Sequence, residues 1–188
     1  MSKRIAFLYQ QARKIKYRVL SGWKSKITGR ARCNQPVLVL GPGRIQYGTN
    51  VQLGYFPSPL FYNTYIHLET RHMESLIKIG NNTKINNNFI AISNRAGIEI
   101  GENCVIGYSV EILDSDFHGF YGKEKGESHL ISKKVIIWNN VFIGSNVKIL
   151  KGSRIGDNSI IGINPVVRGK VSDNVVYAGN PGQIIIHL

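Results

Sequence analysis

Aliphatic residues recur at strict six-residue intervals in the C-terminal part of this chain. They are Ile137, Ile143, Ile149, Ile155, Ile161 and Val167. Small or branched residues stand four positions after each of them, namely Val141, Val147, Ser153, Ser159, Pro165 and Val171. Neither the strand period of about 2.0 residues nor the helix period of about 3.6 fits this spacing over so many repeats. A hexapeptide period predicts a parallel β-helix, an all-β solenoid in which each short strand turns a corner and stacks on the coil below.

The same phase continues upstream and predicts a small bulge. It runs from Ile79 through Ile85 to Ala91 and restarts three residues late, at Ile100. We therefore expect about three extra residues to bulge out of the coil over residues 94–97. The asparagine-rich run before this point suits the corners, because Asn and Gly adopt the left-handed backbone conformation more readily than other residues.

A larger interruption follows His118. The hexapeptide period stops there and resumes only at Ile137, which predicts an excursion loop after His118, over residues 119–134. Loops that leave a rigid solenoid often carry function, because the scaffold has no structural use for them.

Length and composition fit one domain with a continuous core. The chain has 188 residues, of which 43% are hydrophobic, and such a chain can build a single core. A weak repeat predicts that the solenoid begins near residue 37, and we divide the chain into an N-terminal arm, residues 1–32, and a solenoid domain, residues 33–188. Cys104 falls in the repeat phase, so we expect a buried free thiol. No run resembles a transmembrane helix or a signal peptide, and we expect a cytoplasmic protein.

The positive charge is concentrated in the arm. The chain has a net charge of +13, and ten of its 24 Lys and Arg residues precede Cys33, with no acidic residue among them. Leu8, Ile15, Val19 and Trp23 recur at helical spacing, which predicts a basic amphipathic helix of about five turns. Its apolar stripe is expected to pack on the solenoid or on a neighbouring subunit. The alternative is a peripheral contact with an anionic membrane through residues 1–30. Nucleic-acid binding is not expected, because no aromatic and basic reader motif accompanies the charge.

His118 is the main candidate for chemistry. It stands immediately before the excursion loop, two residues after Asp116 and four after Asp114. If the break in the coil places its imidazole at the surface, one of these carboxylates can orient the ring and stabilise its cation. A neutral histidine near pH 7 can accept a proton from a hydroxyl group in a transition state. The alternative is that His118 is an ordinary loop residue.

Several motifs resemble those of the hexapeptide-repeat acetyltransferases. They are Val-Phe-Ile-Gly-Ser at residues 141–145, Ile-Gly-Asp-Asn at 155–158 and the closing Tyr-Ala-Gly-Asn-Pro at 177–181. The match covers about residues 37 to 188, and the Asp-Ser-Asp-Phe-His segment resembles the sugar and polysaccharide O-acetyltransferases. The resemblance implies a left-handed β-helix, a homotrimer with active sites between subunits, acetyl-CoA along the C-terminal coils and a single histidine as general base. The left hand comes from the resemblance alone, because strand crossovers are normally right-handed.

The resemblance also assigns site residues. His118 matches the catalytic histidine, with Asp116 or Asp114 as its partner. Cofactor contacts are implied for a group of residues on the C-terminal coils: Gly144, Ser145, Gly162, Ile163, Arg168 and Lys170. Asn88 and Asn94 are candidates for acceptor binding, although both also suit coil corners. No metal is expected. Two departures from the family pattern are Gly182-Gln183 after Asn-Pro and Phe142 where many relatives have Trp.

The sequence therefore predicts an acetyl-CoA-dependent O-acetyltransferase that acts on a sugar hydroxyl, within a bacterial surface glycan or its precursor. Direct transfer is expected, because no cysteine stands at the site. Two alternatives are weighed against it. His67 and His72 suggest a γ-class carbonic-anhydrase-like zinc enzyme, although they fall in a poorly repeating stretch. A non-catalytic solenoid scaffold is the other, and the excursion loop argues against it.

Overall fold

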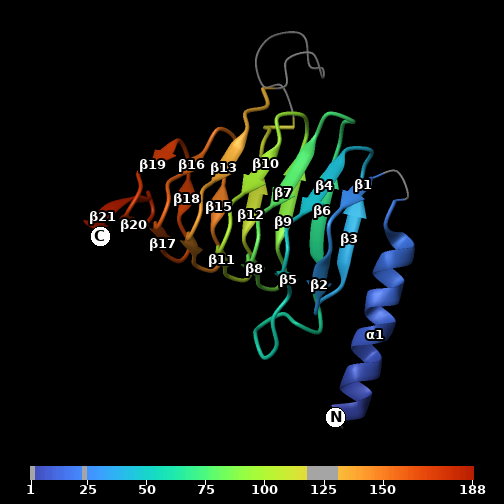
Figure 1. The fold of residues 1–188 in the computed structure, drawn as a ribbon. Coiled ribbons are helices and arrows are strands. Elements are labelled where there is room, and N and C mark those ends of the chain that lie inside the picture. The colour runs from blue at the N-terminus through green and yellow to red at the C-terminus, as the bar shows by residue number, and fades with distance from the viewer. Residues whose placement is uncertain (1–2, 23–24, 118–130) are drawn as a thin grey trace.

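The computed structural model describes residues 3–22, 25–117 and 131–188, and shows one helix beside a three-sided parallel β-helix (Figure 1). The helix α1 spans Lys3–Leu20. Face A contains β1 (Lys26–Thr28), β4 (Arg44–Tyr47), β7 (Leu76–Ile79), β10 (Ile98–Ile100), β13 (Val135–Ile137), β16 (Arg154–Ile155) and β19 (Lys170–Val171). Face B contains β2 (Ala31–Cys33), β5 (Val51–Leu53), β8 (Lys84–Ile85), β11 (Val105–Ile106), β14 (Phe142–Ile143), β17 (Ile160–Ile161), β20 (Val175–Ala178) and β21 (Gln183–His187). Face C contains β3 (Val37–Leu40), β6 (Ile66–Thr70), β9 (Ile90–Ser93), β12 (Glu111–Leu113), β15 (Lys148–Ile149) and β18 (Val166–Val167).

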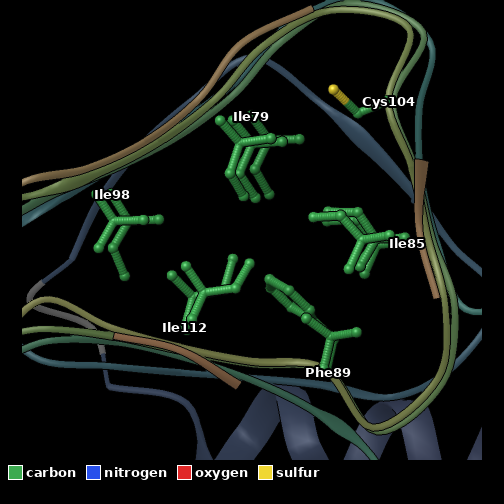
Figure 2. Close-up of a cluster of buried hydrophobic side chains, with 14 of the residues drawn as sticks. Ile79, Ile85, Phe89, Ile98, Cys104 and Ile112 are labelled. Carbon is green, nitrogen blue, oxygen red and sulfur yellow. The ribbon is translucent and has the colours of Figure 1, made fainter. Parts of the chain in front are cut away.

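The predicted ladder of inward aliphatic residues is confirmed. All six residues from Ile137 to Val167 are at most 1% exposed. Ile79 pairs in register with Ile100, and Ile100 with Ile137, so the three-residue shift and the later excursion are both absorbed without loss of stacking. Figure 2 shows the result, with side chains of successive coils stacked in columns inside the triangle. Cys104 is a buried free thiol in this core, as predicted.

The predicted β-helix is confirmed, and its hand is left. Figure 2 looks along the solenoid axis, with α1 and the N-terminal coils behind, so the chain advances toward the viewer. Ile79, Ile85, Phe89 and Ile98 follow one another clockwise in this view. A clockwise path that advances toward the viewer is left-handed.

The A–B corner, where the chain passes from face A to face B, is built from asparagine. Six Asn residues there have positive φ values between 56° and 59°, a conformation that asparagine tolerates. They are Asn50, Asn82, Asn103, Asn140, Asn158 and Asn174. Side-chain amides of neighbouring coils are hydrogen-bonded, as from Asn140 to Asn158 at 3.2 Å and from Asn158 to Asn174 at 3.1 Å. Asparagine therefore forms the turns at this corner in six coils, and Asn82 is the member of the asparagine-rich run among them.

The predicted arm helix is confirmed as α1, which lies beside the first coil (Figure 1). It contacts the solenoid through polar and aromatic side chains, whereas the predicted apolar stripe is exposed: Leu8, Ile15 and Val19 are 65%, 64% and 72% exposed. Residues 26–33 after it form β1 and β2, which pair with β4 and β5. Within the described part of the chain, no helix has the length and apolar character needed to cross a membrane.

Candidate functional site

The excursion loop starts and ends at one point of the C–A corner, where face C passes into face A. His118 and residues 119–130 lie outside the described residues. The structure describes the residues on either side of them, which form the stem of the excursion loop. Ser115 and Ser132 form an antiparallel bridge. Next to it, the backbone N–H of Lys133 donates to the carbonyl oxygen of Asp114 at 2.8 Å. The stem fixes the chain three residues before His118 and at Ser132 on the other side, so both ends of the described stem belong to the coil.

Asp114 holds this stem together. Its side chain is fully buried and accepts three hydrogen bonds, from Ser93 Oγ at 2.8 Å and from the backbone N–H groups of Asn94 and Gly97 at 2.7 Å each. These contacts tie the bulge at residues 94–97, which the sequence predicted, to the base of the excursion. The contacts of Asp114 are therefore structural ones.

We expect Asp114→Ala to destabilise the fold by several kcal/mol. The substitution leaves two buried backbone donors and one hydroxyl without an acceptor, and each such group costs about 1–3 kcal/mol. Urea unfolding of the purified protein measures the loss. Asp116→Ala is the matched control, because Asp116 is exposed and its removal is expected to cost less than about 1 kcal/mol. Equal losses for the two variants would contradict the structural role of Asp114.

Asp116 and Phe117 are closer than Asp114 to His118 along the chain. Each of them contacts a basic residue. Asp116 forms an ion pair with Lys151, which lies at the same C–A corner on the next coil. The guanidinium of Arg71 lies over the ring of Phe117, 4.4 Å from its centroid. Arg71 also pairs with Glu69 at 2.8 Å. Asp116 is thus the exposed one of the two predicted carboxylates, and its described partner is Lys151.

Glu69 connects Arg71 to His67 on the outside of face C. Its carboxyl group lies 3.0 Å from His67 Nε2 and 2.8 Å from Arg71 Nε. Partial burial acts to raise the pKa of Glu69, but the hydrogen bonds from His67 and Arg71 outweigh it, and the pKa lies below its ordinary value. The side chain of His67 is therefore engaged in a hydrogen bond with Glu69. Among the described residues no group of three His, Cys, Asp or Glu side chains could hold a metal ion together with His67 or His72.

The B–C corner, where face B passes into face C, carries a column of glycines. Gly107, Gly144 and Gly162 stack on successive coils. A Cβ added to Gly144 would lie 2.5 Å from the carbonyl oxygen of Gly162 and 3.1 Å from Ile163 Cγ2. Stacking alone therefore requires glycine at position 144, and it leaves a strip of backbone free of side chains. Ile163, one coil above Ser145, borders the strip and is 67% exposed.

Backbone N–H groups along this strip have no acceptor among the described residues. At the A–B corner, the N–H groups of Thr49, Glu102, Asn139 and Asp157 each donate to a side-chain oxygen of the next coil. At the B–C corner, the residues that follow the three glycines are Tyr108, Ser145 and Ile163. Within the described residues no acceptor is found for their N–H groups. The strip therefore offers three aligned donors, spaced by about 4.8 Å from coil to coil, to an extended ligand with carbonyl groups.

The predicted site residues divide between two corners. Gly144, Ser145, Gly162 and Ile163 lie at the B–C corner, together with Asn88 two coils below. Arg168 stands at the C–A corner, on the side of the His118 loop, and the neighbouring Lys170 begins the adjacent strand of face A. Both are exposed, and so is Lys151's partner Asp116. Within the described residues, the stem that leads to His118 therefore shares a corner with Arg168, whereas Gly144, Ser145, Gly162 and Ile163 lie at another corner.

The two acceptor candidates have structural contacts. Asn88 has a φ of 58° and its amide donates to Ser109 Oγ at 3.0 Å. Asn94 is 3% exposed, and its amide lies 3.4 Å from Ser132 Oγ in the stem of the excursion. Both occupy corners, the second role that the sequence analysis gave them.

Sequence reasoning missed Tyr108, Arg71 and a second excursion at the B–C corner, over residues 54–65. The buried side chain of Asn87 fixes that loop, because it accepts from the N–H of Tyr55 and donates to the carbonyl oxygens of Tyr55 and Pro59 at 3.0 Å and 2.8 Å. The signal was present in the two prolines, Pro57 and Pro59, which the hexapeptide pattern does not accommodate.

Comparisons with known proteins confirm the predicted resemblance. No family model matches the chain. Over 81 residues it is 38% identical to a polysialic acid O-acetyltransferase of Neisseria meningitidis, covering 43% of this chain and 38% of that protein. Over 111 residues it is 36% identical to the galactoside O-acetyltransferase of Escherichia coli strain K12, covering 56% and 54%. The chain thus spans about half the length of these curated relatives, or less.

The fold has close counterparts among solved structures. A hexapeptide-repeat-containing acetyltransferase from Vibrio cholerae is 25% identical, with a TM-score of 0.58, and the match covers 98% of this chain and 87% of that one. In fold and in sequence the chain is similar to the hexapeptide-repeat acetyltransferases, as its motifs predicted.

Proposed function

We propose that the protein is an acetyl-CoA-dependent O-acetyltransferase acting on a sugar hydroxyl, with His118 as general base. The observation that carries the proposal is the strip of unpaired N–H groups at the B–C corner, bordered by the exposed Ile163. The extended arm of acyl-CoA has amide and thioester carbonyls that such donors can bind. The apolar side chain of Ile163 would cover this arm from one side. The two relatives named above, both O-acetyltransferases, support the same chemistry.

In this reaction the sugar oxygen attacks the thioester carbonyl directly. The N–H of Ser145, or its hydroxyl, would donate to the oxyanion of the tetrahedral intermediate. His118 would take the proton of the sugar hydroxyl as the new ester bond forms, and the thiolate of CoA would leave as the carbon–sulfur bond breaks. An acyl-enzyme is not needed. Cys104 is buried at the A–B corner, and burial raises the pKa of its thiol, so it is a poor nucleophile.

The site is proposed to form between two copies of the chain in a homotrimer. If the C–A corner of one copy faces the B–C corner of the next, His118 approaches Ser145, and Arg168 and Lys170 approach Ile163. Guanidinium and ammonium groups there would bind the phosphates of the cofactor. The division of the site residues between two corners supports this arrangement, because it leaves each corner incomplete alone.

The acceptor is proposed to be a sugar of a bacterial surface glycan, or of its precursor. The names of the relatives support a saccharide, since they act on polysialic acid and on galactosides. Acetyl-CoA is made and used in the cytoplasm, so we place the reaction there.

Binding of acetyl-CoA tests the cofactor strip. We expect Ile163→Glu to weaken acetyl-CoA binding at least about tenfold, because it puts a negative charge and a hydrated side chain beside the strip. Ile163 is exposed, so the fold should persist. Val19→Glu is the matched control, since Val19 is 72% exposed and lies on α1 rather than at either of the two corners. Calorimetry with the intact protein gives the affinities. Equal binding by Ile163→Glu and the unsubstituted protein would overturn the proposed strip.

A further inference from the structure

The N-terminal third of the chain carries positive charge without any compensation. The first acidic residue of the sequence is Glu69. Eleven basic residues precede it: Lys3, Arg4, Arg13, Lys14, Lys16, Arg18, Lys24, Lys26, Arg30, Arg32 and Arg44. Among the described residues, no ion pair includes any residue before His67. The electrostatic potential at this end of the molecule is therefore positive, and it attracts anionic partners.

The acidic side chains elsewhere are already engaged, so they do not offer a counter-surface. Glu69, Glu74, Glu99, Glu111 and Asp116 form ion pairs with basic neighbours on the solenoid. Glu102, Asp114, Asp157 and Asp173 accept hydrogen bonds from amide or backbone donors. These nine are the acidic residues of the described chain. Through the described residues, a second copy would thus meet the basic end with carboxylates that are already engaged, or with further positive charge.

The helix α1 is attached to the solenoid by its polar side. Gln10 is 5% exposed and donates to the carbonyl oxygens of Asn34 and Phe61 at 3.2 Å and 3.4 Å. Arg13 donates to the same Phe61 carbonyl at 3.1 Å, and also to Thr64. The ring of Tyr17 stacks on Tyr65 with centroids 4.5 Å apart. These contacts fix which face of the helix stays exposed.

The face of α1 that stays exposed is apolar. Leu8, Ile15 and Val19 lie on one stripe of the helix and are each more than three-fifths exposed, with Ala12 between them. Exposed Arg4, Lys16 and Arg18 flank the stripe. A stripe of this kind would normally be buried in a protein core, because exposing it to water costs free energy.

The stripe continues onto the open end of the solenoid. A hollow of ≈ 710 Å³ lies between α1 and the first coil. Its lining combines apolar side chains with basic ones, and includes Ile15, Ile27, Val37, Arg18 and Arg30. Ile27 on β1 is itself 51% exposed. Helix and first coil therefore form one surface, apolar at its centre and basic at its rim, which we call the N-terminal surface.

We propose that the N-terminal surface docks on an anionic lipid bilayer. Lipid headgroups of negative charge complement the basic rim, and the acyl region removes the stripe from water. A nucleic acid would match the charge but leave Leu8, Ile15 and Val19 exposed. Polar attachment of α1 keeps the stripe free for this contact in the folded protein. The proposal does not depend on the acetyltransferase reaction, although docking would bring the enzyme close to lipid-linked saccharides.

Cosedimentation with vesicles tests the docking. We expect the full-length protein to bind vesicles of phosphatidylcholine mixed with phosphatidylglycerol at low salt, and to bind phosphatidylcholine alone much more weakly. Ile15→Ser with Val19→Ser, and separately Lys16→Gln with Arg18→Gln, should each weaken this binding at least about tenfold. Matched controls remove equivalent exposed groups elsewhere: Met73→Ser with Ile185→Ser, and Lys78→Gln with Lys84→Gln. These controls should change binding less than about twofold.

Three outcomes would overturn the proposal. The first is an intact protein that stays in the supernatant with anionic vesicles at low salt. The second is a stripe variant that binds like the intact protein while circular dichroism shows an unchanged fold. The third is a stripe variant whose oligomeric mass falls in analytical ultracentrifugation, because the stripe would then cover a second copy of the chain.

Discussion

His118→Ala is expected to lower the rate of acetyl transfer by about 10² to 10⁴-fold, while the protein still folds and binds acetyl-CoA. The size of the effect follows from the poor acidity of a sugar hydroxyl, which attacks a thioester slowly unless a base removes its proton. The excursion that bears His118 leaves from a stem fixed by Asp114 and by the bridge between Ser115 and Ser132. Replacing the imidazole should therefore not disturb the coils. Release of CoA in the presence of the acceptor measures the rate.

The control for this prediction is His72→Ala, a histidine in the turn after β6. It should keep nearly full activity. If His118→Ala retains more than about a tenth of the activity of the unsubstituted protein, His118 is not the base.

Mixed assemblies add a second readout for the same residue. Chains with His118→Ala and chains with Ile163→Glu should each lose most of their activity alone, when acetyl-CoA is kept near the Kd of the unsubstituted protein. Equal amounts of the two chains are unfolded, mixed and refolded together, so that they assemble at random. If every site takes its base from one copy and its strip from the next, about a quarter of the activity should return. No recovery would mean that one copy supplies both corners.

Ile149→Asp is expected to prevent folding to a soluble protein. Ile149 on β15 is fully buried and pairs with Ile112 below and Val167 above. A carboxylate in this column has no partner, and its burial costs more than the small net stability of a domain of this size can offset. Each coil also supports its neighbours, so the loss spreads along the solenoid.

Expression in the soluble fraction and circular dichroism measure this outcome. Val166→Asp is the matched control, because Val166 is 42% exposed on the outer side of the neighbouring strand and faces Lys148. It should fold normally. A folded Ile149→Asp protein would contradict the inward register on which every site position depends.

The coils could be predicted because their signal is local and repeated. Every sixth side chain must point inward for the coils to stack, so the residues from Ile137 to Val167 define the register without any long-range information. The same counting gave the shift before Ile100, and it placed Ile163 one coil above Ser145. Counting could also have separated Arg168 from Ile163. The two differ by five residues, which moves Arg168 to the next corner.

The left hand and the attachment of α1 could not be derived from the sequence pattern. Strand crossovers favour a right hand, and the actual hand is visible only in the assembled coils (Figure 2). Helical spacing identified the apolar stripe, but Gln10 and Arg13 decide which side is buried, and they bind carbonyl oxygens of the excursion at residues 54–65. That loop has no hexapeptide signal. The sequence therefore left three partners open for the stripe, namely the solenoid, a neighbouring subunit or a membrane, and in one copy of the chain Leu8, Ile15 and Val19 lie on the surface.

A break in the hexapeptide pattern identified the candidate base, but the pattern did not predict the different roles of the two carboxylates beside it. Asp114 and Asp116 both precede His118, yet one is fully buried and braces the bulge while the other is exposed beside Lys151. Only the paths of the coils on either side separate these roles. The unpaired N–H groups of Tyr108, Ser145 and Ile163 likewise have no sequence signature, since they depend on what the next coil fails to supply.

The proposed reaction moves an acetyl group from acetyl-CoA to a sugar hydroxyl. Its most direct test is incubation with acetyl-CoA labelled in the acetyl group and a panel of saccharides, including sialic acid polymers and galactosides. Mass spectrometry follows the saccharide while a thiol reagent follows CoA. We expect labelled acetyl ester on one class of saccharide, matched one for one by released CoA and lost in His118→Ala. Absence of acetyl-CoA binding, or CoA release that is independent of any saccharide and unchanged in His118→Ala, would contradict it.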